Sequence, residues 1–148
     1  MVGNRYTTLL LYYSVLLLSG CCYQKSELTQ EYGSELQAAY EEFTEAVAVA
    51  YETGDTSRLE DTATGHELEY RRETTGYADA KATAGQWRVA VIRVIVREYS
   101  TDTAVIYVEE RVPATAGRPG FETVMIVRFE MVDGKWKVSE VEPYPFQS

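Results

Sequence analysis

Residues 128–138 read RFEMVDGKWKV, two runs that alternate between apolar and polar side chains on either side of Asp133-Gly134. Asp-Gly is a favoured pair for the centre of a type I′ turn, because both central residues of that turn need a positive φ. The stretch therefore predicts a β-hairpin with a two-residue turn. This hairpin is the strongest local signal in the chain, and it implies a sheet in the C-terminal half.

Alternating runs between residues 86 and 142 extend the hairpin to four antiparallel strands. Side chains along a strand point alternately to the two faces, so the apolar set of each strand is expected to face the core. The predicted inward residues are Ala90, Ile92, Val94, Val96, Ala104, Ile106, Val108, Met125, Val127, Phe129, Met131, Trp136 and Val138. The predicted outward residues of the first strand are Val89, Val91, Arg93, Ile95 and Arg97. No ionisable side chain is expected at the centre.

The N-terminal half carries the helical signals. Ser34 is expected to cap an amphipathic helix, since apolar residues recur at helical spacing over residues 36–51 and Gly54 can take the left-handed position that ends a helix. A short helix over residues 58–62 and a third over residues 66–81 are predicted to follow. Helices first and strands second predict an α+β fold, with the N-terminal helices packed on one face of a curved, mainly four-stranded antiparallel sheet.

The first residues resemble a bacterial lipoprotein signal. Residues 9–18 form an apolar block of signal-peptide length, shorter than the roughly 20 residues that cross a bilayer. Leu18-Ser19-Gly20-Cys21 is similar to a lipobox, which implies cleavage before Cys21 and lipid modification of its thiol. The alternative is an ordinary secretory signal or an uncleaved signal anchor, with Cys21 and Cys22 incidental.

This resemblance implies four parts: a lipoprotein signal peptide over residues 1–20, a flexible tether over 21–33, the α+β domain over 34–144 and a tail over 145–148. The lipid bilayer would then be a partner of the protein through acylated Cys21. Acyl chains contribute about 0.8 kcal/mol per buried CH₂, so several chains on one residue hold a soluble domain at a membrane. The expected location is the extracytoplasmic face of a cell membrane.

The domain itself resembles the nuclear-transport-factor-2-like cone fold, the superfamily that includes the SnoaL-like cyclases. Residues 36–51, 59–70 and 87–98 and the ending FEMVDGKWKVSEV at residues 129–141 carry the likeness, which covers about residues 34–144. Within that superfamily these segments are similar to the intermembrane-space domain of plastid-division proteins and their bacterial relatives. The resemblance implies either a small-molecule enzyme or a domain that binds other chains.

Composition excludes several classes of function. The net charge of −9 repels a phosphate backbone, so nucleic acid is not an expected partner. Cys21 and Cys22 are the only cysteines and His66 is the only histidine, which excludes a disulfide framework and the usual zinc clusters. No phosphate-binding glycine loop or calcium loop occurs. We therefore expect no metal and no cofactor.

His66 and Tyr70 are the candidates for a pocket or for acid–base chemistry, since histidine is the natural general base near neutral pH. His66 follows Gly65, however, and is expected at a helix start or on the surface. SnoaL-like enzymes carry acidic and histidine groups inside the cone, whereas the predicted inner face here is apolar. The sequence thus predicts no catalytic residue and a non-catalytic binding or protein-interaction module. The alternative is a SnoaL-like isomerase, cyclase or hydrolase with a pocket between helices and sheet.

Arginines on the strands form a second candidate site. Arg93, Arg97 and Arg128 are expected on the outer face of the sheet, where they could dock a protein partner or a second copy of the chain. The alternative is cross-strand ion pairing on a solvated face, with glutamates such as Glu109 and Glu110 as partners, at about 0.2–1 kcal/mol for each pair.

Overall fold

The computed structural model describes the backbone of residues 5–145 and the side chains of residues 27–145. The helices are α1 (Arg5–Thr53), α2 (Ser57–Thr62), α3 (Gly65–Thr75) and α4 (Ala80–Thr83), followed by the 3-10 turn η1 (Ala84–Trp87). The strands are β1 (Ala90–Tyr99), β2 (Thr103–Val112), β3 (Phe121–Val132) and β4 (Lys135–Pro143). The order of elements confirms the predicted α+β architecture.

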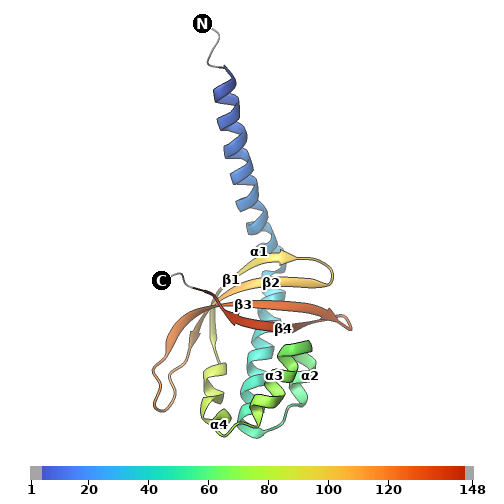
Figure 1. Cartoon of the computed structure of the whole chain (residues 1–148), viewed down its shortest axis with the longest axis vertical. Helices are drawn as coiled ribbons and strands as arrows, with labels where there is room; N and C mark the ends of the chain where they lie inside the picture. The colour runs from blue at the N-terminus through green and yellow to red at the C-terminus, as the bar shows by residue number, and fades with distance from the viewer. Residues whose placement is uncertain (1–4, 146–148) are drawn as a thin grey trace.

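The strands form one open antiparallel sheet in the order β1-β2-β3-β4, and the sheet curves around α1 (Figure 1). Helix α1 packs against β1 and β4, and α3 packs against β4. The apolar core lies between these helices and the sheet. Its largest fully buried side chains include Tyr40, Phe43, Leu36, Phe129 and Ile106.

The turn between β3 and β4 confirms the predicted hairpin. Asp133 and Gly134 have φ values of 52° and 77°, as a type I′ turn requires, and Val132 pairs with Lys135 across it. Trp136 and Val138 are buried, and the inward set of β3 also follows the predicted alternation.

Strand β1 departs from the predicted alternation. Its register with β2 shifts between Val91 and Arg93 and again between Val96 and Glu98, so that one residue is inserted at each point. Val89 and Val91, predicted to face outward, pack against the core, whereas Ile92, predicted to face inward, is 46% exposed. Each inserted residue turns the following side chains to the other face, and the bulges bend the strand around α1.

Helix α1 begins well before Ser34, so the predicted N-cap there is wrong. The ring of Tyr32 stacks on Tyr99 of β1 at 3.6 Å between centroids, and the backbone N–H of Val96 donates to Oγ1 of Thr29 at 3.0 Å. Leu28 also packs against the core. These side chains continue the buried face of α1 towards the N-terminus, so at least residues 28–33 belong to the folded domain rather than to a flexible tether.

The proposed signal peptide and lipid anchor stay predictions. Residues 1–4 and the tail residues 146–148 lie outside the described chain, as do the side chains of Cys21 and Cys22. The N-terminal part of α1 projects beyond the sheet (Figure 1). In the part of the chain that the structure describes, no helix has the length and apolar character that a membrane span requires.

Candidate binding cavity

A hollow lies between the helices and the inner face of the sheet. It consists of two adjoining spaces that share Trp87, Met125 and Pro143 in their walls. The Arg71 compartment, of about 360 Å³, is lined in addition by His66, Glu67, Tyr70, Arg71, Glu140 and Val141. The Glu110 compartment, of about 290 Å³, is lined in addition by Tyr40, Gln86, Val89, Glu110, Val112, Phe121 and Thr123. We call the two together the helix-side cavity.

The Glu110 compartment holds a buried carboxyl group. Glu110 of β2 is 4% exposed, and its Oε2 accepts a hydrogen bond of 2.7 Å from the hydroxyl of Tyr40 on α1. Burial raises the pKa of the Glu110 carboxyl, and the hydrogen bond from Tyr40 partly offsets that rise. Burial and the neighbouring Glu110 together raise the pKa of the Tyr40 hydroxyl well above its usual value. The tyrosine therefore acts as a hydrogen-bond donor here.

The inward position of Glu110 corrects the sequence analysis, which placed this residue among the outer glutamates and expected nothing ionisable at the centre. Glu110 pairs with Val91 of β1 and Thr123 of β3 on the inner face. The signal was present in the sequence, because strict alternation from Ala104 through Val108 places Glu110 on the same face. A charged side chain on a strand is therefore not exposed by its charge alone when the alternation places it on the inner face.

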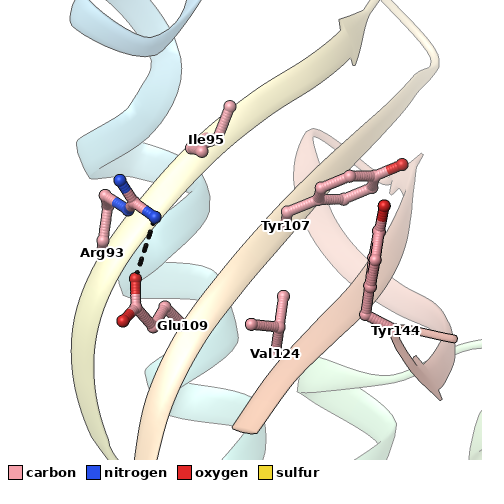
Figure 2. Close-up of a pocket in the computed structure, with 6 residues that line it drawn as sticks. All are labelled: Arg93, Ile95, Tyr107, Glu109, Val124 and Tyr144. Atoms are coloured by element: carbon pink, nitrogen blue, oxygen red, sulfur yellow. Dashed lines mark ion pairs between the residues drawn. The ribbon is translucent and has the colours of Figure 1, made fainter. Parts of the chain in front are cut away.

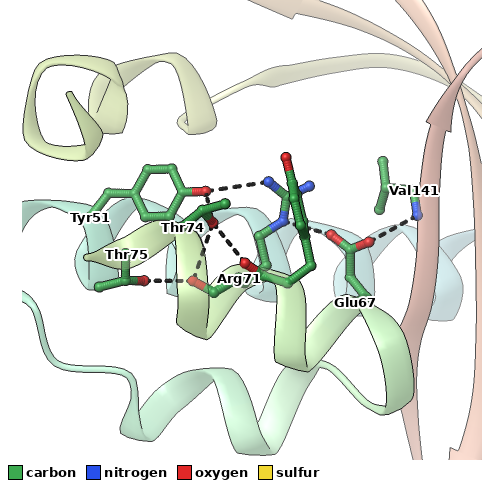
Figure 3. Close-up of polar contacts among 7 residues, drawn as sticks. Tyr51, Glu67, Arg71, Thr74, Thr75 and Val141 are labelled. Carbon is green, nitrogen blue, oxygen red and sulfur yellow. Dashed lines mark hydrogen bonds and ion pairs between the residues drawn. The ribbon is translucent and has the colours of Figure 1, made fainter. Parts of the chain in front are cut away.

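The Arg71 compartment is bordered by a buried ion pair (Figure 3). Nε of Arg71 donates to Oε1 of Glu67 one helical turn earlier, at 2.6 Å, and Oε2 of Glu67 accepts from the backbone N–H of Val141 on β4 at 3.3 Å. Nη1 of Arg71 lies 3.4 Å from the hydroxyl of Tyr51, and the guanidinium lies 4.2 Å from the centroid of Trp87. The pair thus ties α3 to α1, η1 and β4.

This network was missed from sequence. The spacing of Glu67 and Arg71 at i and i+4 is visible there, but the same spacing occurs in exposed pairs. Only the packing of α3 against β4 shows that this pair is on the buried face of the helix.

The predicted candidates His66 and Tyr70 lie at the rim of the Arg71 compartment. Both are exposed, and their rings face each other with centroids 6.3 Å apart. Among the described residues, His66 makes no hydrogen bond to a carboxylate, since the neighbouring Glu67 points inward to Arg71. The two side chains border the cavity without forming an acid–base pair.

The three arginines of the predicted docking patch lie on the outer face of the sheet. Arg93 pairs with Glu109 at 3.0 Å, and Arg128 pairs with Glu140 at 3.0 Å and Glu142 at 3.3 Å. The guanidinium of Arg97 lies 4.9 Å from the centroid of the Tyr107 ring. The face therefore carries the cross-strand ion pairs that the alternative interpretation described.

A shallow groove of about 160 Å³ crosses the same face (Figure 2). This outer groove is lined by Arg93, Ile95, Tyr107, Glu109, Val124 and Tyr144. The rings of Tyr107 and Tyr144 meet edge to face at 5.3 Å between centroids. Ion pairs and apolar side chains thus alternate on this face.

Comparisons with known proteins give distant likenesses among solved structures. No family model and no curated protein matches the chain. Among solved structures, the chain is similar to the intermembrane space region of the chloroplast protein ARC6, at 13% identity and a TM-score of 0.48, over 73% of this chain and 92% of that one. It is also similar to a SEC-C motif containing protein from Rhodopseudomonas palustris, at 16% identity and a TM-score of 0.40, over 66% of this chain and 72% of that one. Neither likeness assigns a family or a function to this chain.

Proposed function

We propose that this protein is a non-catalytic binding module with a cone-like α+β domain, anchored by lipid on Cys21 at the extracytoplasmic face of a membrane. The helix-side cavity holds a small ligand. Ligand sites are typically concave and mostly apolar, with a few placed polar groups. The observation that carries the proposal is a hollow of this kind, with Trp87 and Met125 in its shared wall and the buried Glu110 on one side.

The walls favour binding over chemistry. Glu67 and Arg71 already satisfy each other, and His66 is exposed at the rim without a carboxylate to orient it. One observation favours the alternative of a SnoaL-like enzyme. Glu110 is a buried carboxyl of raised pKa inside a cavity, and such groups serve as general acids or bases. An enzyme would alter a bound ligand over time, and mass spectrometry of the ligand recovered from wild type and from Glu110→Gln distinguishes the two.

The cavity is tested with full-length protein in a non-ionic detergent. 1-Anilinonaphthalene, an uncharged dye that fluoresces in apolar sites, is titrated below the critical micelle concentration of the detergent against wild type and against Met125→Trp, which fills the shared wall. The substitution is expected to abolish most of the signal. Val124→Trp, on the same strand but on the outer face, is the matched control and should retain it. Equal dye binding by wild type and Met125→Trp would refute a ligand site in this cavity.

The anchor is tested by growing cells with an alkynyl fatty acid and coupling a fluorophore to the lysate. Wild type and Cys22→Ala should be labelled, and Cys21→Ala should not. Label that persists in Cys21→Ala would overturn the anchor and leave the cavity untouched.

The outer face of the sheet supports a second binding role, in which a second copy of the chain docks there. Arg93 and Glu109 both line the outer groove, so two copies related by a two-fold axis can pair these unlike charges around the apolar side chains. Light scattering of wild type should then give a dimer, and Tyr107→Glu in the groove should give a monomer. Tyr77→Glu, at an exposed tyrosine away from the sheet, should remain dimeric. A monomeric wild type would end this part of the proposal.

A further inference from the structure

We propose that the Glu110 compartment binds an organic ammonium ion, with the Glu110 carboxylate as its counter-ion and aromatic side chains as its walls. This inference rests on the proposed function, because it names the class of ligand that the helix-side cavity takes.

The first argument is an uncompensated carboxylate. Each of the other acidic side chains that line the cavity has a cationic partner: Glu67 pairs with Arg71 at 2.6 Å, and Glu140 pairs with Arg128 at 3.0 Å. Among the described residues, Glu110 forms no ion pair, and its one hydrogen bond joins Oε2 to the neutral hydroxyl of Tyr40. Buried charges are normally paired, so a cation from outside would complete this site.

The second argument is the free oxygen. Oε2 already accepts from Tyr40, whereas Oε1 of Glu110 accepts no hydrogen bond found among the described residues and is the oxygen more open to a ligand in the compartment. A guanidinium group prefers both oxygens of a carboxylate at once, whereas an ammonium group is a point charge that one oxygen satisfies. One carboxylate, with Gln86, Thr123 and the Tyr40 hydroxyl as the other side-chain oxygens of the lining, also falls short of the oxygen cage that a divalent metal needs.

The third argument is the wall. Tyr40, Trp87 and Phe121 line the compartment, and aromatic faces attract cations. Phe121 is 54% exposed on the inner face of β3, so a large apolar ring stands uncovered beside the buried carboxyl. Trp87 already receives one cation, the guanidinium of Arg71, whose charge Glu67 balances. An ammonium group with a small apolar body would cover Phe121 and reach Glu110.

Three compounds that share one apolar body test the class of ligand. 2-Phenylethylamine, 2-phenylethanol and phenylacetate are titrated into full-length protein in a non-ionic detergent near neutral pH, with binding measured by calorimetry. The amine should bind about tenfold or more tightly than the alcohol, and phenylacetate should bind least. In Glu110→Gln the preference for the amine over the alcohol should vanish, while the alcohol still binds.

Two further variants keep the test decisive. Glu109→Gln changes the neighbouring carboxylate on the outer face and should bind the amine as wild type does. Tyr40→Phe frees the second oxygen of Glu110 and should retain the preference for the amine, so it reports on the site even if Glu110→Gln folds poorly.

Equal affinity of wild type for amine and alcohol would overturn the inference, as would an amine preference that survives in Glu110→Gln. If the anilinonaphthalene dye enters the cavity but the amine does not bind, the ammonium class is wrong and the proposed cavity stands. If neither the dye nor any of the three compounds binds, the proposed function itself has failed.

Discussion

Replacing Glu67 with methionine tests whether α3 is packed as the structure describes. The side chains of Arg71 and Glu67 are 9% and 4% exposed, and every other ion pair found among the described residues has both partners at least 33% exposed. In Glu67→Met the guanidinium of Arg71 keeps its contacts with Tyr51 and Trp87 but loses its counter-ion, and the N–H of Val141 loses its acceptor.

Removing one partner of a buried ion pair costs about 3–5 kcal/mol. Because Arg71 keeps its place over Trp87, we expect the lower end, about 3 kcal/mol of the free energy of unfolding. The double variant Glu67→Met/Arg71→Met replaces both charges with apolar groups of similar length. It should recover most of the loss, since a well-packed apolar pair in place of a buried ion pair is often neutral or stabilising.

The assay is urea unfolding followed by circular dichroism of the helices and by tryptophan fluorescence. The matched control is Glu109→Met, which breaks the exposed pair with Arg93 and should cost about 1 kcal/mol or less. If Glu67→Met costs no more than this control, the pair is solvated and α3 does not bury it against β4. Arg71→Met is measured as well. If the loss of unfolding free energy in the double variant equals the sum of the losses in Glu67→Met and Arg71→Met, the two charges are not coupled.

Three further predictions concern Glu110, α1 and the hairpin. Because burial raises the pKa of Glu110, this group stabilises the fold at acidic pH and loses that contribution as pH rises through its native pKa. Glu110→Gln should therefore have a higher free energy of unfolding than wild type near neutral pH, and this difference should shrink in acid. Urea unfolding at several pH values measures the difference, and a difference that does not change with pH would contradict the prediction. Tyr32→Ala should lower the free energy of unfolding by about 1–2 kcal/mol through the lost stack on Tyr99, and no change would return residues 21–33 to the role of a tether. Gly134→Ala should lower the free energy of unfolding by about 1 kcal/mol in thermal unfolding, because no neighbouring atom would crowd the new Cβ and only the backbone at φ 77° is strained. Gly76→Ala, at a negative φ, is the control and should cause no such loss.

Short-range chemistry made much of the fold predictable. Asp133-Gly134 specified the hairpin because few other pairs adopt two positive φ values, and Gly54, at φ 79°, ends α1 as expected. Alternation along β3 and β4 placed Val127, Phe129 and Val138 in the core as predicted. These features depend on neighbours within a few residues, so the sequence contains all the information they need.

The inner face of β1 could not be predicted in the same way. Its two bulges insert Ile92 and Arg97 between paired residues, and each one reverses the alternation that follows. A bulge depends on the curvature that the sheet needs to wrap around α1, which is a property of the assembled layers. The half-buried contacts of Thr29 and Tyr32 could not be predicted for a related reason, because the surrounding residues are polar and no local signal marks the face that β1 covers.

By itself, then, the sequence determined the order of the elements, the α+β class, the type I′ turn and the apolar faces of the later strands. The tertiary structure alone decided which charged residues are buried. Alternation along β2 places Glu110 on the inner face, but Glu67 and Arg71 resemble surface residues in the sequence. All three line or border the cavity because α1, α3 and the curved sheet close over them. Burial of a charge is set by the partners that reach it from distant parts of the chain, and those partners meet only in the folded protein.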